Sequence, residues 1–132
     1  MPHVRRVVRL AALRGEKVLL LQKGAGWFFP GGRVQIFETA EEALRAKLHS
    51  QLPRLYVNWE RLTGLVTLFG EARKGETSVF TLYVCPDIDG YFEPRAGIGI
   101  SAVELVARSD YPLSDITHRM WDQLVAHGYL SG

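Results

Sequence analysis

Residues 29–53 read FPGGRVQIFETAEEALRAKLHSQLP, a proline-glycine-glycine turn that leads directly into a helical pattern. Thr39 and Glu42 have the S/T-x-x-E spacing of a capping box, in which two side chains satisfy free N–H groups at a helix start. An apolar stripe recurs every four residues along this pattern, at Ala40, Leu44, Leu48 and Leu52. Pro53 cannot continue a helix. The segment therefore predicts a tight turn followed by a helix with one buried face and an end near Pro53.

The second half of this helix contains no acidic residue. After Glu42 the next carboxylate in the chain is that of Glu60. Lys47, Ser50 and Gln51 occupy positions i, i+3 and i+4, which lie side by side on one helix face. That face is therefore neutral or positively charged.

The composition is that of an ordinary globular protein. The chain has 132 residues, a hydrophobic fraction of 47%, a charged fraction of 23% and a net charge of +2. This length predicts a single domain over residues 1–132. The small net charge gives no reason to expect nucleic acid as a partner. We interpret the basic residues near the N-terminus as a solvated strand edge; they are Arg5, Arg6, Arg9 and Arg14.

The sequence predicts a soluble, reduced, cytoplasmic protein. Cys85 is the only cysteine and lies in an apolar run, so we expect a small core residue and no intrachain disulfide. The four histidines have no zinc-ligand spacing. Arg9 and Arg14 interrupt the apolar N-terminal run, which is therefore not a signal peptide. No stretch approaches the roughly 20 apolar residues that span a bilayer, so no membrane partner is predicted.

Strand and helix patterns alternate along the chain. In order, we expect a β-hairpin (4–13 and 18–22), a glycine-rich loop (24–32), the helix described above, two strand-like runs (56–70 and 77–88), a region that is mostly loop (88–100) and a second helix (113–128). Gly15 and Gly75 lie in the predicted hairpin turns, and Ser114 or Asp115 caps the second helix. This order predicts an α/β fold, a mixed β-sheet between helices in an α/β/α sandwich.

The loop and helix start resemble the opening of the Nudix motif, G-x5-E-x7-R-E-U-x-E-E-x-G-U, of enzymes that hydrolyse nucleoside diphosphates linked to another group. Gly32 matches the first glycine of the motif, and Glu38 lies at the required distance. Pro30 and Gly31 complete the common P-G-G, and Trp27 stands where an aromatic residue often precedes it. The wider order of elements agrees as well, so the resemblance covers nearly the whole chain and implies a Nudix-like sandwich.

The second half of the motif is lost. Ala46 and Lys47 fall on the R-E pair, Ser50 and Gln51 on the E-E pair, and Pro53 on the glycine. In the family, glutamates at these positions share one helix face and bind Mg²⁺, which needs hard, charged oxygen ligands. A lysine ammonium about 4 Å from a cation would cost on the order of 4 kcal/mol per unit of charge at an effective dielectric near 20. We therefore predict no metal ligand on this helix and no cofactor.

The resemblance leaves a candidate anion site. Gly31, Gly32 and Arg33, together with the helix start, could cradle a phosphate group. Lys47 could supply fixed positive charge where the family uses a metal, although a lysine on a helix also commonly faces water. We take these four residues as candidate ligand-binding residues.

Glu38 is the remaining candidate catalytic residue, with support of the helix N-terminus as its alternative role. Trp27 and Phe29, with Phe28 between them, are candidates for stacking a nucleobase. The alternative is that these aromatic side chains fill the core.

Three functions fit this sequence. The first is a Nudix-fold protein that has lost Mg²⁺-dependent hydrolysis and acts as a binding or regulatory module for a nucleotide-like phosphate ligand. The second is a divergent Nudix hydrolase that binds Mg²⁺ with carboxylates outside the helix, such as Glu71, Glu76 or Glu93. The third is a structural or subunit-interaction protein, with a homodimer as the expected partner state. We prefer the first, in which the protein is not a pyrophosphohydrolase of the usual kind.

Overall fold

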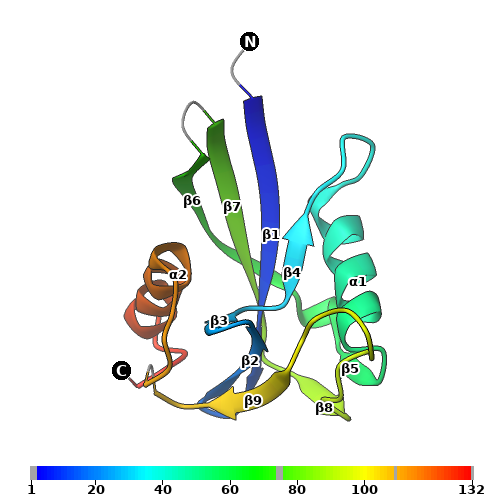
Figure 1. Cartoon of the computed structure of the whole chain (residues 1–132). Coiled ribbons are helices and arrows are strands. Elements are labelled where there is room, and N and C mark those ends of the chain that lie inside the picture. The colour runs from blue at the N-terminus through cyan, green and yellow to red at the C-terminus, as the bar shows by residue number, and fades with distance from the viewer. Residues whose placement is uncertain (1–2, 74–75, 109, 132) are drawn as a thin grey trace.

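The computed structural model describes residues 3–73, 76–108 and 110–131 (Figure 1). The strands are β1 (His3–Arg14), β2 (Lys17–Lys23), β3 (Gly26–Phe28), β4 (Gly31–Arg33), β5 (Leu55–Val57), β6 (Thr63–Arg73), β7 (Glu76–Cys85), β8 (Ile88–Gly90) and β9 (Ala102–Val106). The α-helices are α1 (Ala40–Gln51) and α2 (Asp115–Ala126), and a 3₁₀ turn, η1, covers Trp59–Arg61. The predicted turn at Gly75 lies outside the described residues.

Strand β1 organises a mixed sheet. It pairs in parallel with β7 from His3↔Glu76 to Ala12↔Cys85, and β7 pairs antiparallel with β6. On its other edge, β1 pairs antiparallel with β4 at Val8↔Gly32 and then with β2. The sheet order is β3-β2-β1-β7-β6, with β4 on β1 and β9 on β2. The predicted mixed β-sheet is confirmed.

The two helices lie on opposite sides of this sheet (Figure 1). Ala43, Leu44 and Leu48 of α1 pack in one core cluster. Trp121 and Leu124 of α2 pack in a second. The arrangement confirms the predicted α/β/α sandwich, because each helix buries its apolar stripe against its own face of the sheet. No helix in the described part of the chain is long and apolar enough to cross a membrane.

The strand pairing differs from the predicted hairpin. β1 and β2 pair only near their turn, at Leu13↔Val18 and Arg14↔Lys17. The rest of β2 instead pairs with β3 and with β9, which the sequence analysis did not predict. Strands β1 and β2 separate beyond their turn because the residues of β1 that precede Leu13 pair with β4 and β7. This divergence leaves room beside β1 for the P-G-G turn.

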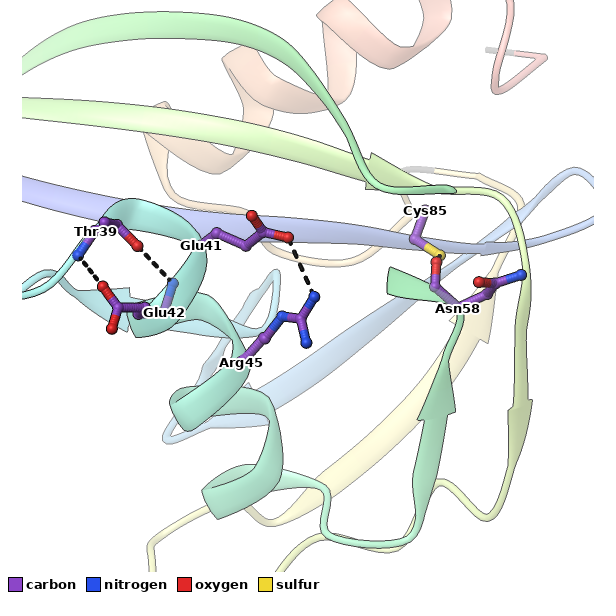
Figure 2. Close-up of polar contacts among 6 residues, drawn as sticks. All are labelled: Thr39, Glu41, Glu42, Arg45, Asn58 and Cys85. Carbon is purple, nitrogen blue, oxygen red and sulfur yellow. Dashed lines mark hydrogen bonds and ion pairs between the residues drawn. The ribbon is translucent and has the colours of Figure 1, made fainter. Parts of the chain in front are cut away.

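Helix α1 begins as its sequence predicts. The Glu42 backbone N–H donates to Thr39 Oγ1 at 3.1 Å, and the Thr39 N–H donates to Glu42 Oε1 at 3.0 Å (Figure 2). The exposed pair Arg45–Glu41 lies at 3.3 Å, where it contributes little because solvent screens it. Contacts between residues three positions apart therefore determine where the helix starts, independently of tertiary packing.

Replacing Thr39 with alanine should lower the free energy of unfolding by about 1 kcal/mol, because the helix loses its cap. The Thr39 backbone and side chain lower the pKa of Glu42 from its usual value. A depressed carboxyl pKa contributes stability above the unfolded-state pKa, and this contribution disappears as the pH falls through the folded-state pKa. Urea unfolding measures both effects: Thr39→Ala should be less stable than the parent at neutral pH, and the difference between the parent and Glu42→Gln should become smaller in acid, because an amide does not ionise. A constant difference would contradict the reciprocal contact.

Cys85 is buried at the end of β7, as predicted for a core residue. Its thiol donates toward the carbonyl oxygen of Asn58 at 3.4 Å (Figure 2) and toward that of Asp87 at 3.3 Å. These contacts tie the end of β7 to the segment before η1. Cys85 therefore has a structural role in the core.

Candidate functional site

A cavity of about 460 Å³ opens between the sheet, the second half of α1 and the loop that precedes β9. Strands β1, β2, β3 and β4 each contribute side chain or backbone to its lining. From α1 the lining residues are Lys47, Ser50 and Gln51, which confirms that these three positions share one face. The cavity therefore lies against the second half of the helix, whereas the expected anion cradle was at the helix start.

The P-G-G turn can lie directly against β1 because Gly31 has no side chain. Gly31 has a φ of +139°, and a Cβ built on it would lie 2.1 Å from the Val8 carbonyl oxygen. No other residue fits such a close approach. Gly31 therefore places β4 directly on β1, and Gly31 and Gly32 form one wall of the cavity.

Gln51 fixes this wall from the helix side. Its Oε1 accepts the Gly31 N–H at 3.1 Å, and its Nε2 donates to the Gly31 carbonyl oxygen at 3.0 Å. Both ends of the amide are thus engaged with one glycine. A glutamate could accept the first bond but could not make the second, so the amide is required for the pair.

Lys47 lies along the same wall. Its stem packs on Gly32, because a Cβ on that glycine would be 3.0 Å from Lys47 Cε and 3.1 Å from Cδ. The side chain is half-buried and lines the cavity. Lys47 therefore stands beside the P-G-G turn.

Arg9 is a site residue that the sequence analysis missed. It lines the cavity, donates from Nη1 to the Phe29 carbonyl oxygen at 3.2 Å and holds its guanidinium 5.3 Å from the Phe28 ring centroid. Burial, with a smaller contribution from the charge of Arg5, lowers the pKa of Arg9 to about 10. The group remains protonated at neutral pH. The solvated strand edge inferred from the basic cluster is therefore wrong for Arg9, because β4 and the P-G-G turn cover it.

The charge of the cavity has one sign. Arg9, Lys23 and Lys47 line it, and no carboxylate does so among the described residues. In the same part of the chain, no group of three or more His, Cys, Asp or Glu side chains could hold a metal ion. Mg²⁺ requires charged oxygen ligands, so the donor set at this cavity does not fit the metal that the motif implies.

The three aromatic candidates are divided between the core and the cavity. Trp27 is only 7% exposed and packs edge-on against Tyr111 at 4.7 Å, and Phe29 is fully buried. Both belong to the core cluster on the α2 side, so they fill the core as the alternative interpretation held. Phe28 alone of the three lines the cavity. Successive side chains along an extended segment point to opposite faces, which separates Phe28 from its neighbours.

Arg33 and Glu38 also lie away from the cavity. Arg33 is exposed and lines a separate depression with Val4 and Ile36. Glu38 Oε1 accepts the Gln35 backbone N–H at 2.9 Å and so closes the turn before α1. Glu38 therefore has a structural contact in this turn, and it does not line the cavity.

The carboxylates proposed as substitute ligands are not gathered either. Glu93 lies 3.6 Å from Arg54 in an exposed ion pair, and Glu76 pairs with His3 in the sheet. Neither lines the cavity. The side chain of Glu71 lies outside the described part of the chain.

A model of the NUDIX domain matches residues 3–125. The chain is similar to the solved structure of a MutT NUDIX hydrolase from Burkholderia pseudomallei (TM-score 0.78, 24% identity, 92% of this chain and 98% of that chain covered). It is also similar to the ORF135 protein of E. coli (TM-score 0.76, 20% identity, 96% and 94% covered) and to a MutT structure from work on Aliivibrio salmonicida and Vibrio cholerae (0.74, 16%, 94% and 98%). A comparison with curated protein sequences gives no significant match. Identities this low show the fold alone, whereas the domain match covers most of the sequence, and the chain therefore belongs to the Nudix family.

Proposed function

We propose that this Nudix-family protein binds a nucleotide-like phosphate compound in the cavity and does not hydrolyse nucleoside diphosphates with Mg²⁺. One observation carries the proposal. Three cationic side chains and no carboxylate line the described cavity, on the helix face where the family motif places its metal-binding glutamates. A site with this charge attracts an anion directly and repels the cation that hydrolysis needs.

Arg9 supplies the energetic argument for an anionic ligand. It is largely buried, and no ion pair to it is present among the described residues. A buried cation without an anionic partner is unfavourable, since it has lost part of its hydration without gaining an opposite charge. A phosphate in the cavity would provide that charge and accept charge-assisted hydrogen bonds.

The side chains, rather than the glycine backbone, make this anion site. The Gly31 N–H is already donated to Gln51, so it is not available to a phosphate. Lys47 instead lays its stem along Gly32 and lines the cavity, and Arg9 and Lys23 complete the positive lining. The C-terminal carbonyls of α1, which would repel an anion, are partly neutralised because Arg95 Nε donates to the Ser50 carbonyl oxygen at 2.9 Å.

We expect ADP and inorganic pyrophosphate to raise the melting temperature in excess EDTA, because a ligand that binds only the folded state stabilises it. EDTA alone should leave the melting temperature unchanged. In calorimetry, Lys47→Met should weaken binding by about tenfold to a hundredfold, the value of one hydrogen bond to a charged group.

Lys17→Met is the matched control, because Lys17 is exposed on β2 and does not line the cavity. It removes the same charge and should leave the affinity at the parent value. The proposal is wrong if neither anion binds at millimolar concentration. The proposal is also wrong if EDTA lowers the melting temperature by many degrees, since the fold would then depend on a bound metal ion.

A further inference from the structure

We infer that the cavity selects phosphate compounds whose remaining part is apolar, a conclusion that rests on the proposed function. The same cavity that carries the three cations is lined by Phe28, Ile98 and Ile100. A ligand that fills it therefore contacts a charged part and an apolar part together. The class that matches is a phosphate ester of an aromatic or aliphatic group.

The two isoleucines are presented by a special backbone. Gly97 and Gly99, on either side of Ile98, both have a φ of +82°, which L side chains rarely adopt. Ile98 and Ile100 are only half-buried, so part of each side chain is open to a ligand. Gly99 also lies against Lys23, since a Cβ there would be 3.5 Å from Lys23 Cε. The apolar wall and the charged wall therefore adjoin.

Hydrogen bonds fix this loop at both ends. The Arg95 backbone N–H donates to the Gln51 carbonyl oxygen at 2.9 Å. The Arg95 side chain donates from Nε to the Ser50 carbonyl oxygen, also at 2.9 Å. At the other end, the Ser101 N–H donates to the Gln22 carbonyl oxygen at 2.9 Å. The loop is thus tied to α1 and to β2, and Ile98 and Ile100 are held between these ties. A wall fixed in this way loses little entropy when a ligand packs against it.

The cavity has little with which to recognise a polar group. Of the two neutral polar side chains in its described lining, Gln51 has both amide atoms engaged with Gly31. Ser50 alone has no hydrogen bond from its hydroxyl to another described residue. The hydroxyls of a sugar would lose water here without gaining enough neutral partners, whereas the face of an aromatic ring, that of a nucleobase included, needs none. An apolar group has no such loss.

Isothermal calorimetry in EDTA with three probes tests this inference. The probes are inorganic phosphate, ribose 5-phosphate and 1-naphthyl phosphate, of which the last two differ in the polarity of the ester group. We expect 1-naphthyl phosphate to bind at least about tenfold more tightly than ribose 5-phosphate, since burial of the ring against Phe28, Ile98 and Ile100 removes apolar surface from water.

The double variant Ile98→Ser/Ile100→Ser should lose this preference and retain the parent affinity for inorganic phosphate. Ile36→Ser, at a position that is 98% exposed and outside the cavity, should change neither. If neither these probes nor ADP and pyrophosphate bind, the proposed function fails. If ADP or pyrophosphate binds and none of the three probes does, only the present inference is overturned. If phosphate binds but the parent protein prefers ribose 5-phosphate or shows no preference, only the present inference is overturned. This parent comparison decides the outcome even if the double variant does not fold.

Discussion

Nucleoside diphosphate compounds incubated with this protein and millimolar Mg²⁺ are expected to stay almost intact. Turnover should be at least about 10³-fold slower than that of a Nudix hydrolase whose motif keeps its glutamates, because a metal clamp contributes several kcal/mol and each 1.36 kcal/mol is tenfold in rate. Lys47, Ser50 and Gln51 line the cavity, and none is a charged oxygen ligand. Chromatography of a panel of ADP-linked compounds over hours measures this directly.

Robust turnover that requires Mg²⁺ would overturn the proposed loss of hydrolysis. Glu71, Glu76 and Glu93 would then be the first residues to replace, each by glutamine, to locate a substitute ligand. Two of these have other neighbours in the structure, since Glu93 pairs with Arg54 and Glu76 lies opposite His3. A rate that is unaffected by EDTA would point to contamination or to a reaction unrelated to the motif. The matched control is the same preparation of Lys47→Met, which should be equally inactive.

Local interactions made α1 predictable from the sequence. Its cap joins residues three positions apart, and its apolar stripe follows the helical period, so both can be read without knowing the tertiary structure. The Gln51–Gly31 contact joins residues 20 positions apart and was not foreseen. The motif alignment identified Gln51 only as a residue that cannot bind metal, because nothing in the local sequence states which backbone its amide will meet.

Strand β9 and the role of Arg9 escaped prediction for the same reason. β9 forms because Val18 to Gln22 offer an edge 80 to 88 positions earlier in the chain, and a five-residue segment carries too little periodicity to show this. Arg9 was grouped with its basic neighbours by composition. Its position within the apolar run VVRLAALR was the available signal, since a strand that is paired on both edges buries side chains that a free edge would expose.

The two-residue period of an extended chain separates the three neighbouring aromatic residues, and this separation can be derived from the sequence. Their composition and their place between glycines make Trp27, Phe28 and Phe29 one group of stacking candidates. Treated as β-strand, they alternate, and one of the three must face the side opposite to the others. Which side carries the cavity depends on the placement of α1 and the loop before β9, and this is information that only the tertiary structure contains.

Replacing Lys47, Ser50 and Gln51 together with glutamate should destabilise the protein and create a response to divalent ions. All three positions line one cavity, so the new carboxylates will gather there. At position 51 a carboxylate oxygen would face the Gly31 carbonyl oxygen that now accepts the Gln51 amide at 3.0 Å. The lost bond and the uncompensated acceptor should lower the free energy of unfolding by about 2–4 kcal/mol without metal. Millimolar Mg²⁺ or Mn²⁺ should restore part of it, since an ion held by three carboxylates binds only the folded state.

The control is a triple variant with the carboxylates placed on three separate elements, Lys17→Glu, Thr77→Glu and Ala96→Glu. These residues are exposed, and the substitutions change the formal charge by the same amount. Lys17 lies on β2, Thr77 on β7 and Ala96 in the loop before β9, and no described cavity is lined by two of them, so Mg²⁺ should leave the melting temperature of this variant unchanged. Lys47→Glu alone should respond only weakly, because a single carboxylate is a poor site for an ion that gives up its water reluctantly. If calorimetry detects no divalent ion on the cavity variant and its melting temperature does not move, these positions do not correspond to the metal-binding face of the family. The positive charge at this cavity could then not be understood as the replacement of a metal ion by Lys47.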